Sequence, residues 1–455
     1  MEMSLKQRKE ARYGNRTFQV EPYGIETVGQ VERHGSVRSQ FTLWLGSNLT
    51  IADFALGFLP VSLGLPWPWM ILAILLGNVA GSLLLGMSAA MGPTYGLPQL
   101  MIGRFSFGRI GGFIPALFNY LSTIGWFAVN NILGTFGLRV LFPQLSFWQG
   151  ALFLVVIQGL LAIYGHNLIH AYERLMSIVL AVLFAIITLV ALLHTRQLTA
   201  YHPVTSGLWP LFATMVAAAF SYVGSWGPYA SDYSRYLSER TDRRSIIWHV
   251  FGGSLIASVW LELVGAFVAV LAGADASDPI SALHAVTGGF GALAVIAVVL
   301  GGTAADALNL YSNALTAGAL GIRLPRWLLA VVASGIGLVL SLFGSGHFEQ
   351  NYENFLLMLG YWMTPWLGVL FTDFFILRRD QIVKTDFRAS RSFYWPGVFS
   401  FVIGIICSLP FMNGPFYEGR VAKIMGGADI SFYVGFVVAG FIYYGLAKRA
   451  SVSLD

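Results

Sequence analysis

Trp126 and Asn130 are the first residues whose types and spacing suggest chemistry. They lie in the apolar stretch 108–138, and Asn131 follows directly. Positions four apart share one face of a helix, so the indole and the carboxamide point into one space. A planar heterocycle needs this combination, because a ring offers a stacking surface and an amide both donates and accepts hydrogen bonds. The pair alone is also compatible with a lipid-facing Trp and an Asn that links two helices.

Carboxyl groups inside apolar stretches indicate a second kind of chemistry. Asp306 lies in 303-TAADALNLYSNALT-316, close to Asn309, and Asp53 lies in the first apolar stretch. A charged side chain at the middle of a bilayer costs at least ~2.5–3.5 kcal/mol, so each carboxyl needs a partner, a proton or a water-filled cavity. Either carboxyl can therefore serve in proton coupling. The alternative is a structural Asp that is hydrogen-bonded, or one that lies nearer the membrane surface.

Two apolar stretches carry a Gly-Ser pair near their middle. These are 44-WLGSNLTIAD-53, with Gly46-Ser47, and 222-YVGSWGPYASD-232, with Gly224-Ser225. Pro228 follows the second pair, and it interrupts a helix because it lacks a backbone donor. Interrupted helices at matching places in two halves are typical of inverted-repeat transporters, whose unpaired backbone groups bind substrates or ions. Gly and Pro are also common in membrane helices that only kink or pack closely.

Motifs of enzymes and metal sites are missing from the sequence. It contains no HExxH motif, CxxC cluster, phosphate-binding loop or nucleophile elbow, and no alternating strand pattern. We therefore expect neither an enzyme nor a resident metal or cofactor. The single cysteine, Cys407, excludes an internal disulfide framework, and its apolar surroundings predict a buried side chain.

The elements that must position these residues are transmembrane helices. Hydrophobic residues make up 56% of the chain, charged residues only 11%, and the mean hydropathy is +0.68. Soluble domains carry roughly 25% charged residues, so this chain cannot cover a water-facing surface. A span needs roughly 17–25 residues. The stretches that we expect to span, twelve in all, are 40–64, 67–92, 108–138, 147–165, 171–195, 207–234, 246–273, 289–320, 325–345, 352–378, 392–412 and 427–448.

The loops between these stretches predict the orientation of the chain. Lys and Arg gather in every second loop, as in 235-RYLSERTDRRS-245, whereas 272–279 and 346–354 contain none; Arg196, Arg420 and Lys423 are exceptions. The bias follows the positive-inside rule and predicts both termini in the cytosol. The polar, basic first forty residues predict a cytosolic arm and not a signal peptide. A net charge of +5 fits this topology and gives no indication of nucleic-acid binding.

Three segments together resemble the purine-cytosine permeases of the nucleobase-cation-symport-1 family. They are 98-PQLMIGRFSFGRIGG-112, 124-IGWFAVN-130 and 222-YVGSWGPYASDYSRY-236, and the resemblance extends from about residue 20 to 448. It implies an all-α integral membrane protein of twelve helices, with a leucine-transporter-type arrangement of two inverted five-helix repeats. The parts that we expect are a cytosolic arm at 1–39, repeats at 40–195 and 207–378, two further helices at 392–448 and a cytosolic tail at 449–455.

The resemblance also implies a central substrate site. In this family the substrate stacks on a span-three Trp, here Trp126, and an Asn one turn on, here Asn130, contributes hydrogen bonds. A span-six aromatic closes the other face, and we expect Trp226, with Tyr222 as the alternative. The complete expected substrate-binding set is Ser47, Asn48, Trp126, Asn130, Tyr222, Ser225, Trp226 and Asn309.

One departure from the family pattern bears on the coupling ion. Sodium-coupled members place adjacent hydroxyl residues on span eight, where this chain has Ala304 and Ala305. Neither side chain can coordinate a cation, and Thr303 is rotated by about 100° around the helix. We therefore expect a co-transported proton, with Asp306 or Asp53 as its carrier, and leave sodium open.

The expected function is that of a symporter which imports a nucleobase by alternating access: cytosine, or a purine such as adenine, guanine or hypoxanthine. It would be a multi-pass protein of the plasma (inner) membrane and a monomer, an oligomer being left open. The alternatives are a sodium-coupled importer of uracil, allantoin, a hydantoin or a thiamine precursor, and an amino-acid transporter of the same fold. A passive channel is disfavoured, and so is an intramembrane enzyme, for which the sequence offers no catalytic constellation.

Overall fold

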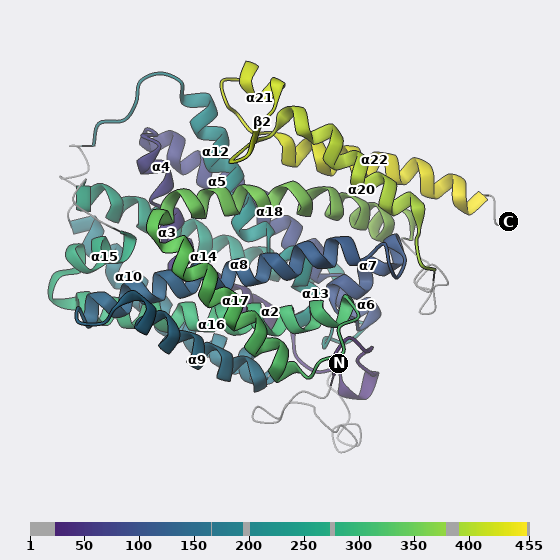
Figure 1. Cartoon of the computed structure of the whole chain (residues 1–455), viewed down its shortest axis with the longest axis horizontal. Helices are drawn as coiled ribbons and strands as arrows, with labels where there is room; N and C mark the ends of the chain where they lie inside the picture. Colours follow the sequence, from purple (N-terminus) through teal and green to yellow (C-terminus); the bar gives the residue numbers. More distant parts are fainter. Residues whose placement is uncertain (1–22, 165, 194–200, 274–277, 379–390, 453–455) are drawn as a thin grey trace.

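The computed structural model describes residues 23–164, 166–193, 201–273, 278–378 and 391–452, and these are mostly helical (Figure 1). Several features predicted above lie outside the described residues: most of the N-terminal arm, Arg196, the middle of the loop 272–279, most of the loop 378–391 and the end of the tail.

The long helices follow the predicted apolar stretches closely. In chain order they are α2 (Val37–Asn48) with α3 (Ile51–Leu56) and α4 (Leu59–Ser62), α5 (Trp67–Ala89), α8 (Phe113–Leu141), α9 (Phe147–Tyr164), α10 (His166–Leu193), α12 (Leu208–Gly224) with η2 (Gly227–Tyr229) and α13 (Ala230–Ser234), α14 (Arg243–Ala272), α16 (Gly291–Ala319), α17 (Arg326–Gly344), α18 (Phe348–Phe371) with the π-helical η6 (Thr372–Leu377), α20 (Trp395–Ser408) with η7 (Leu409–Phe411), and α22 (Ser431–Val452).

Short elements connect the long helices. They are η1 (Gln30–Glu32), α6 (Gly92–Tyr95), α7 (Gln99–Phe107), α15 (Pro279–Thr287), η4 (Gly288–Phe290), η5 (Ser345–His347), the antiparallel strands β1 (Asn413–Gly414) and β2 (Tyr417–Glu418), and α21 (Arg420–Ile424).

The lengths and composition of the helices suit a bilayer. Among the described residues, seven helical stretches are long and apolar enough to cross a membrane, and the bent pair α2 and α3–α4 makes an eighth. The stretch Trp327–Leu377 contains two long helices, α17 and α18, each of which corresponds to one predicted span. Three shorter apolar helices are Phe147–Leu160, Arg174–Val190 and Trp395–Phe411. Every predicted stretch thus contains a helix, and the arrangement is consistent with twelve spans.

The first span is broken, but not where the Gly-Ser pair predicts. Gly46 and Ser47 lie inside α2, and the chain bends by 54° only after Asn48. Within α2, Ser47 Oγ donates to the carbonyl of Leu43 and Asn48 Nδ2 to that of Trp44, both at 2.7 Å. The prediction of a break at Gly46-Ser47 was wrong because these short polar side chains bond back to their own helix and leave it intact.

Thr50 begins the second half of this span. Its backbone is extended, and its Oγ1 accepts a hydrogen bond from the amide of Asp53 at 3.3 Å. A Thr in this N-cap position satisfies one of the amides that have no partner at the start of a helix. The same Oγ1 lies 2.9 Å from the phenol oxygen of Tyr222 on α12. The bend is thereby tied to the sixth span.

The sixth span is interrupted at the predicted place. Regular α-helix ends at Gly224, with Ser225 as C-cap, and the 3-10 turn η2 contains Pro228. Helix α13 then continues to Ser234, so that Leu208–Ser234 forms one 27-residue apolar stretch. Because Pro228 offers no amide, the local change of helix type follows from the sequence.

Close contact between glycines fixes the second half of the first span against α14. A methyl group on Gly57 would lie 2.1 Å from the carbonyl oxygen of Glu262, and one on Gly265 would lie 2.1 Å from that of Phe54. Only hydrogen fits at these two positions, and small residues permit such an approach between membrane helices. As a result, the side chains of α3 and α14 that flank the contact meet directly.

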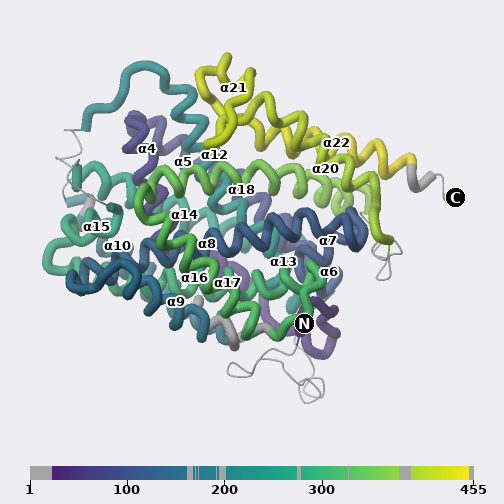
Figure 2. The backbone as a smooth tube through the Cα atoms, in the orientation of Figure 1, coloured from purple at the N-terminus to yellow at the C-terminus, as the bar shows by residue number. Residues whose placement is uncertain are grey.

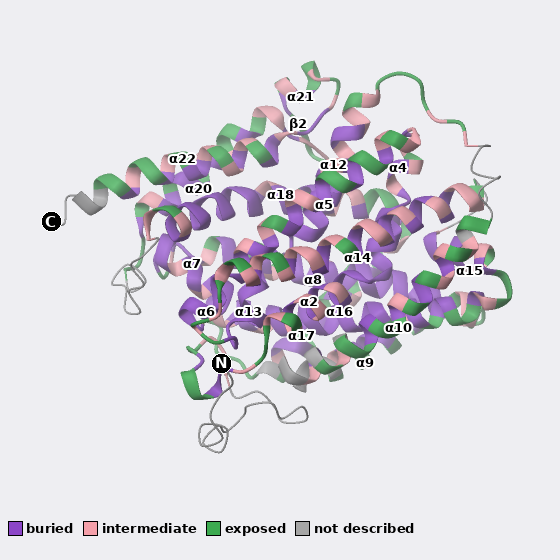
Figure 3. Ribbon diagram, turned by 180° about the vertical axis from the view of Figure 1, so that it is seen from behind, coloured by how far each residue is buried: buried purple, intermediate pink, exposed green. Residues whose placement is uncertain are grey.

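The helices form one elongated bundle whose interior is the most buried part (Figures 2 and 3). Helices α2, α8, α14 and α16 lie inside, while α20 and α22 lie together along one edge. Segments α6, α7 and α13 are at one end of the bundle, and α4 and α15 are at the other (Figure 1). Outward-facing side chains such as Leu160, Ile178 and Phe441 are large, apolar and exposed, as a lipid-facing surface requires.

Cys407 belongs to this outer surface. It lies on α20 and is exposed, so the prediction of a buried side chain was wrong. An apolar surrounding sequence does not distinguish a helix face that meets protein from one that meets lipid, because both are apolar.

Candidate functional site

Trp126 lies at the centre of an aromatic cluster. Its side chain on α8 is only 5% exposed. The ring meets Tyr222 of α12 edge-on with centroids 5.2 Å apart, Phe355 of α18 at 5.2 Å and Tyr352 of α18 at 6.1 Å. The indole Nε1 donates to Ser225 Oγ at 3.1 Å. Three spans therefore contribute to one aromatic wall.

The aromatic side chain that contacts Trp126 from the sixth span is Tyr222, the alternative in the sequence prediction. The ring of Trp226 contacts Trp44 of α2 at 5.6 Å and Tyr229 at 5.3 Å. Both Trp226 and Tyr222 are buried. Trp226 thus lies next to Ser225 in the chain, yet its ring packs toward the first span.

Asn130 and Asn309 meet at a single carboxyl group. Asn130 Nδ2 donates to Asp306 Oδ1 at 3.0 Å, and Asn309 Nδ2 reaches the same oxygen at 3.5 Å. Asn309 Oδ1 in turn accepts from the phenol of Tyr229 at 3.3 Å. All three polar side chains are 2% exposed or less. The i, i+4 spacing on α8 and the i, i+3 spacing on α16 thus bring the predicted polar residues together.

Several polar atoms in this region have no hydrogen-bond partner among the described residues. They include Asn130 Oδ1, Asp306 Oδ2, Asn48 Oδ1 and the indole Nε1 of Trp44. A buried polar atom without a partner costs free energy, so such atoms mark a place where a polar ligand is stabilised. Three acceptors and one donor are available here.

The side chains of Ser47 and Asn48 are less free than predicted. Their donor groups are used within α2, as described above, which leaves the Asn48 carbonyl oxygen as the available group. Leu49 and Thr50 form the bend that follows Asn48, and both residues are buried. The polar group that the first span offers to the site is therefore the Asn48 carbonyl oxygen, next to the bend.

Asp53 is fully buried and adjoins a second carboxyl that the sequence reasoning missed. Its side chain lies close to the carboxyl of Glu262 and the hydroxyl of Ser258, both on α14. Asn78 Nδ2 of α5 donates to Glu262 Oε1 at 2.8 Å. The signal for Glu262 was present, since it is the one acidic residue in the apolar stretch 246–273.

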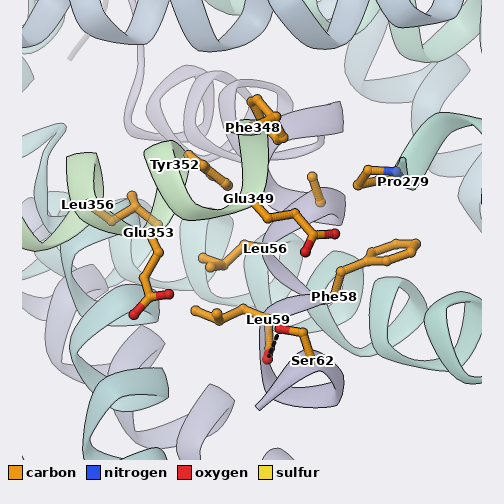
Figure 4. Close-up of a pocket in the computed structure, with 11 residues that line it drawn as sticks. Leu56, Phe58, Leu59, Ser62, Pro279, Phe348, Glu349, Tyr352, Glu353 and Leu356 are labelled. Atoms are coloured by element: carbon orange, nitrogen blue, oxygen red, sulfur yellow. Dashed lines mark hydrogen bonds between the residues drawn. The ribbon is translucent and has the colours of Figure 1, made fainter. Parts of the chain in front are cut away.

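A small hollow lies between α3, α4 and α18, and Tyr352 of the aromatic cluster is one of its lining residues (Figure 4). Residues of α3 and α4, including Leu56 and Leu59, face Glu349, Tyr352 and Glu353 of α18 across it. Tyr352 contacts Trp126 and also donates from its phenol to the carbonyl of Ala52 at 3.0 Å. One side chain thus borders both the hollow and the central cluster. Sequence reasoning missed Tyr352 and Phe355, which look like ordinary packing aromatics.

The other end of the bundle is covered by the segment 23–36. Val28 N donates to the carbonyl of Gly96 at 2.9 Å, and Arg235 Nη1 donates to that of Gly24 at 2.7 Å. Arg33, a buried residue of this segment, donates to the carbonyl of Pro93. Hydrogen bonds therefore hold the segment over α6 and α13, at the end of the molecule opposite to α4 and α15.

The span-eight residues bear on cation binding. Ala304 and Ala305 are buried and have no oxygen in their side chains, and Thr303 Oγ1 donates to the carbonyl of Val299 at 2.9 Å. Among the described residues there is no group of three or more His, Cys, Asp or Glu arranged to hold a metal ion. The acidic groups near the cluster are Asp306 and the Asp53–Glu262 pair.

Comparison with known proteins identifies the family of the chain. Residues 27–435 match the family model described as "Permease for cytosine/purines, uracil, thiamine, allantoin". A Bacillus subtilis protein assigned by name to the purine-cytosine permeases is 30% identical over 95% of this chain and 96% of its own length. A purine-cytosine permease of Emericella nidulans is 27% identical over 93% of this chain and 87% of its own.

Among solved structures, the fold is similar to that of a nucleobase-cation-symport-1 family transporter in a closed conformation with bromovinylhydantoin bound. The TM-score is 0.77, the sequence identity is 19%, and the match covers 95% of this chain and 96% of that one. At this identity the similarity shows the shared fold, and the leucine-transporter-type arrangement expected from the sequence is confirmed at that level.

Proposed function

The chain belongs to the family of permeases for cytosine/purines, uracil, thiamine and allantoin, and on this premise we propose that it imports a nucleobase together with a proton. The proposed substrates are cytosine and purines such as adenine, guanine and hypoxanthine. The protein is a multi-pass membrane transporter and not an enzyme. We place it in the plasma membrane as a monomer, with both termini in the cytosol.

The observation that carries the substrate proposal is the combination of Trp126 with open acceptors on Asn130 and Asp306. The indole offers a flat surface for a planar ring. The free oxygens accept hydrogen bonds from ring N–H or exocyclic amino groups, which cytosine, adenine and guanine all carry. Trp44 Nε1 supplies a donor for a ring nitrogen or carbonyl. An amino-acid substrate would instead need donors directed at its carboxylate.

Alternating access is supported by the asymmetry of the two ends. A hollow that shares Tyr352 with the cluster lies at one end, and the hydrogen-bonded segment 23–36 covers the other. The interruptions in the first and sixth spans lie between the two ends. We propose that the repeats 40–195 and 207–378 rock around these interruptions and expose the cluster to one side at a time.

Proton coupling is supported by the chemistry of the buried groups. Buried carboxyls are available to carry a proton, whereas span eight offers no pair of free hydroxyls for sodium. Hard cations such as sodium prefer several oxygen ligands. Asp306 and Asp53 are the proposed carriers.

Uptake in proteoliposomes tests the function directly. We expect labelled cytosine or adenine to accumulate when the outside is acidified, with no effect of replacing sodium by choline and complete loss with a protonophore. An unlabelled panel of uracil, allantoin, a hydantoin and a thiamine precursor should compete less well than cytosine and purines. Uptake of an amino acid without any uptake of these bases would contradict the proposal, and uptake that never exceeds equilibrium would indicate a channel.

A further inference from the structure

Asp53 and Glu262 form a pair of buried carboxyls at the contact between the first span and α14. The glycine contact at Gly57 and Gly265 brings the two helices together, and both carboxyl side chains are 0% exposed. The carboxyl of Asp53 lies close to that of Glu262 and to the hydroxyl of Ser258, which is one turn before Glu262 on α14. Asn78 fixes Glu262 Oε1 with a hydrogen bond of 2.8 Å.

No positive charge balances this pair. Among the described residues, no Lys, Arg or His pairs with Asp53 or Glu262, and the other titratable groups that face them are the phenols of Tyr222 and Tyr352. Asp53 Oδ1, Asp53 Oδ2 and Glu262 Oε2 receive no hydrogen bond of regular geometry from these residues. Two ionised carboxyls in buried contact without a cation are strongly unfavourable, and pairs of this kind share a proton.

The pair is connected to the substrate site through the bend in the first span. Asp53 N donates to Thr50 Oγ1, which contacts the phenol of Tyr222, and Tyr222 packs against Trp126. On the second path, Tyr352 donates to the carbonyl of Ala52 beside Asp53 and also packs against Trp126. Separation of the two carboxyls would therefore move groups that line the aromatic cluster.

We propose that Asp53 and Glu262 together are the binding site of the transported proton. This inference rests on the proposed function and assigns its coupling step to a pair in place of a single Asp. One proton from outside binds to a carboxyl oxygen, forms a hydrogen bond to the second carboxyl and holds α3 against α14. When the proton leaves to the cytosol, the two negative charges repel, and the contact seen in this structure opens.

The test separates exchange from accumulation, with Glu262→Gln and Asp53→Asn as variants in phosphatidylethanolamine/phosphatidylglycerol liposomes. An amide imitates the protonated carboxyl, so labelled adenine should still exchange against internal adenine. Accumulation driven by an acidic exterior should fall to an inside-to-outside ratio of one. The pH dependence of exchange should disappear, and Glu262→Asp should restore part of the accumulation.

Two controls sharpen the experiment. Glu418→Gln changes an exposed glutamate on β2 in the same way and should accumulate adenine as the unmodified protein does. Asp306→Asn should keep the pH dependence of exchange, whatever it does to affinity, because the proton is assigned to the other site. Unchanged accumulation in Glu262→Gln, or loss of the pH dependence only in Asp306→Asn, would overturn the inference.

A second measurement decides the matter if the two variants fail to insert. Infrared difference spectra of the unmodified protein between acidic and alkaline buffer should show loss of a protonated buried carboxyl, and Asp306→Asn should retain this signal. Absence of the signal, or accumulation that requires sodium, would refute the shared proton. If the unmodified protein exchanges no nucleobase at all, the proposed function fails instead, so the two failures are distinguishable.

Discussion

The polar atoms around Trp126 fall into two groups, those bonded within the protein and those open to a ligand. Ser225 receives the indole N–H, and Asn130 uses its amino group on Asp306. The oxygens of Asn130 and Asp306 that remain open are acceptors. A substrate that brings N–H groups at the edge of a flat ring satisfies them without disturbing the internal bonds. The arrangement therefore selects for donors on the substrate.

Trp126→Ala should remove the stacking surface. Aromatic stacking of a base is worth roughly 1–3 kcal/mol, so we expect adenine binding to weaken by about 5- to 150-fold. Equilibrium binding to the purified protein measures this loss. The matched control is Trp148→Ala on α9, whose ring is exposed on the outer surface and should leave affinity unchanged. Unaltered binding in Trp126→Ala, with normal insertion, would remove Trp126 from the site.

Asn130→Ala should act on both binding and stability. It removes one open acceptor, and it also removes a donor from Asp306 Oδ1, which leaves a buried carboxyl less satisfied. Loss of a partner from a buried polar group costs about 1–3 kcal/mol. We expect a lower unfolding temperature together with weaker adenine binding. Thermal unfolding with and without adenine separates the two effects, and a variant with unchanged stabilisation by adenine would contradict the role of Asn130.

At the scale of single residues, the sequence predicted the polar half of the site better than the aromatic half. Asn130, Asp306 and Asn309 stand out because polar groups are costly in apolar helices, and they do meet. Tyr352 and Phe355 do not stand out, since aromatics are common in every span. Only the contact between α8 and α18, which are distant in the chain, shows that they meet Trp126.

The elements that matter most are the interrupted first and sixth spans. Thr50 connects them, because its hydroxyl caps α3 and contacts Tyr222 of α12. The Gly-Ser rule predicted the sixth interruption but placed the first too early. The local sequence indicates that a helix is weakened. The position of the interruption depends on which side chain can cap the next helix, and in the first span that residue is Thr50.

Thr50→Val should destabilise the bend while preserving the shape of the side chain. Loss of an N-cap costs about 0.5–2 kcal/mol, and the contact with Tyr222 is lost as well. We expect a lower unfolding temperature and slower adenine exchange. Thr42→Val on α2 is the matched control, since its hydroxyl bonds only to carbonyls of its own helix. Equal behaviour of the two variants would show that the cap has no role.

Gly265→Ala should force α3 away from α14. The added methyl would overlap the carbonyl of Phe54, and overpacking of this kind typically costs 1–3 kcal/mol. We expect reduced stability together with weaker coupling of uptake to pH, because the carboxyls of Asp53 and Glu262 would separate. Gly445→Ala on α22, where nothing lies within 4 Å, should be neutral or slightly stabilising in the same assays. A stable Gly265→Ala protein with normal pH dependence would contradict the importance of the contact.

At the scale of the whole molecule, the distribution of charge predicts the orientation in the membrane. The end that contains α6, α7 and α13 carries many arginines, including Arg104, Arg109, Arg235 and Arg240, whereas α4 and α15 mark the other end. The positive-inside rule therefore assigns the arginine-rich end to the cytosol and the hollow to the outside. The helical spans were the easiest feature to predict, because lipid imposes apolar length on every span, whereas the orientation stays a prediction.

Sidedness can be measured by cysteine labelling in a Cys407→Ser background. Arg240 and Glu418 are both exposed and lie at opposite ends by this assignment. A membrane-impermeant thiol reagent added to intact cells should label Glu418→Cys, and should label Arg240→Cys only after permeabilisation. Labelling in the reverse order would contradict the assigned topology and would place the hollow on the cytosolic side.

The segment 23–36 has a further consequence for how the protein is made. Its hydrogen bond from Arg235 to Gly24 joins residues 211 positions apart. At synthesis rates of roughly 5–20 residues per second, Gly24 waits about 10–40 s before Arg235 leaves the ribosome. Arg235 is not yet made while the first five spans insert, so its hydrogen bond to Gly24 forms late. The end of the bundle that the segment 23–36 covers is therefore completed late, although the segment itself is made early. A bulky fusion just before the segment should therefore spare membrane insertion and impair the final closure.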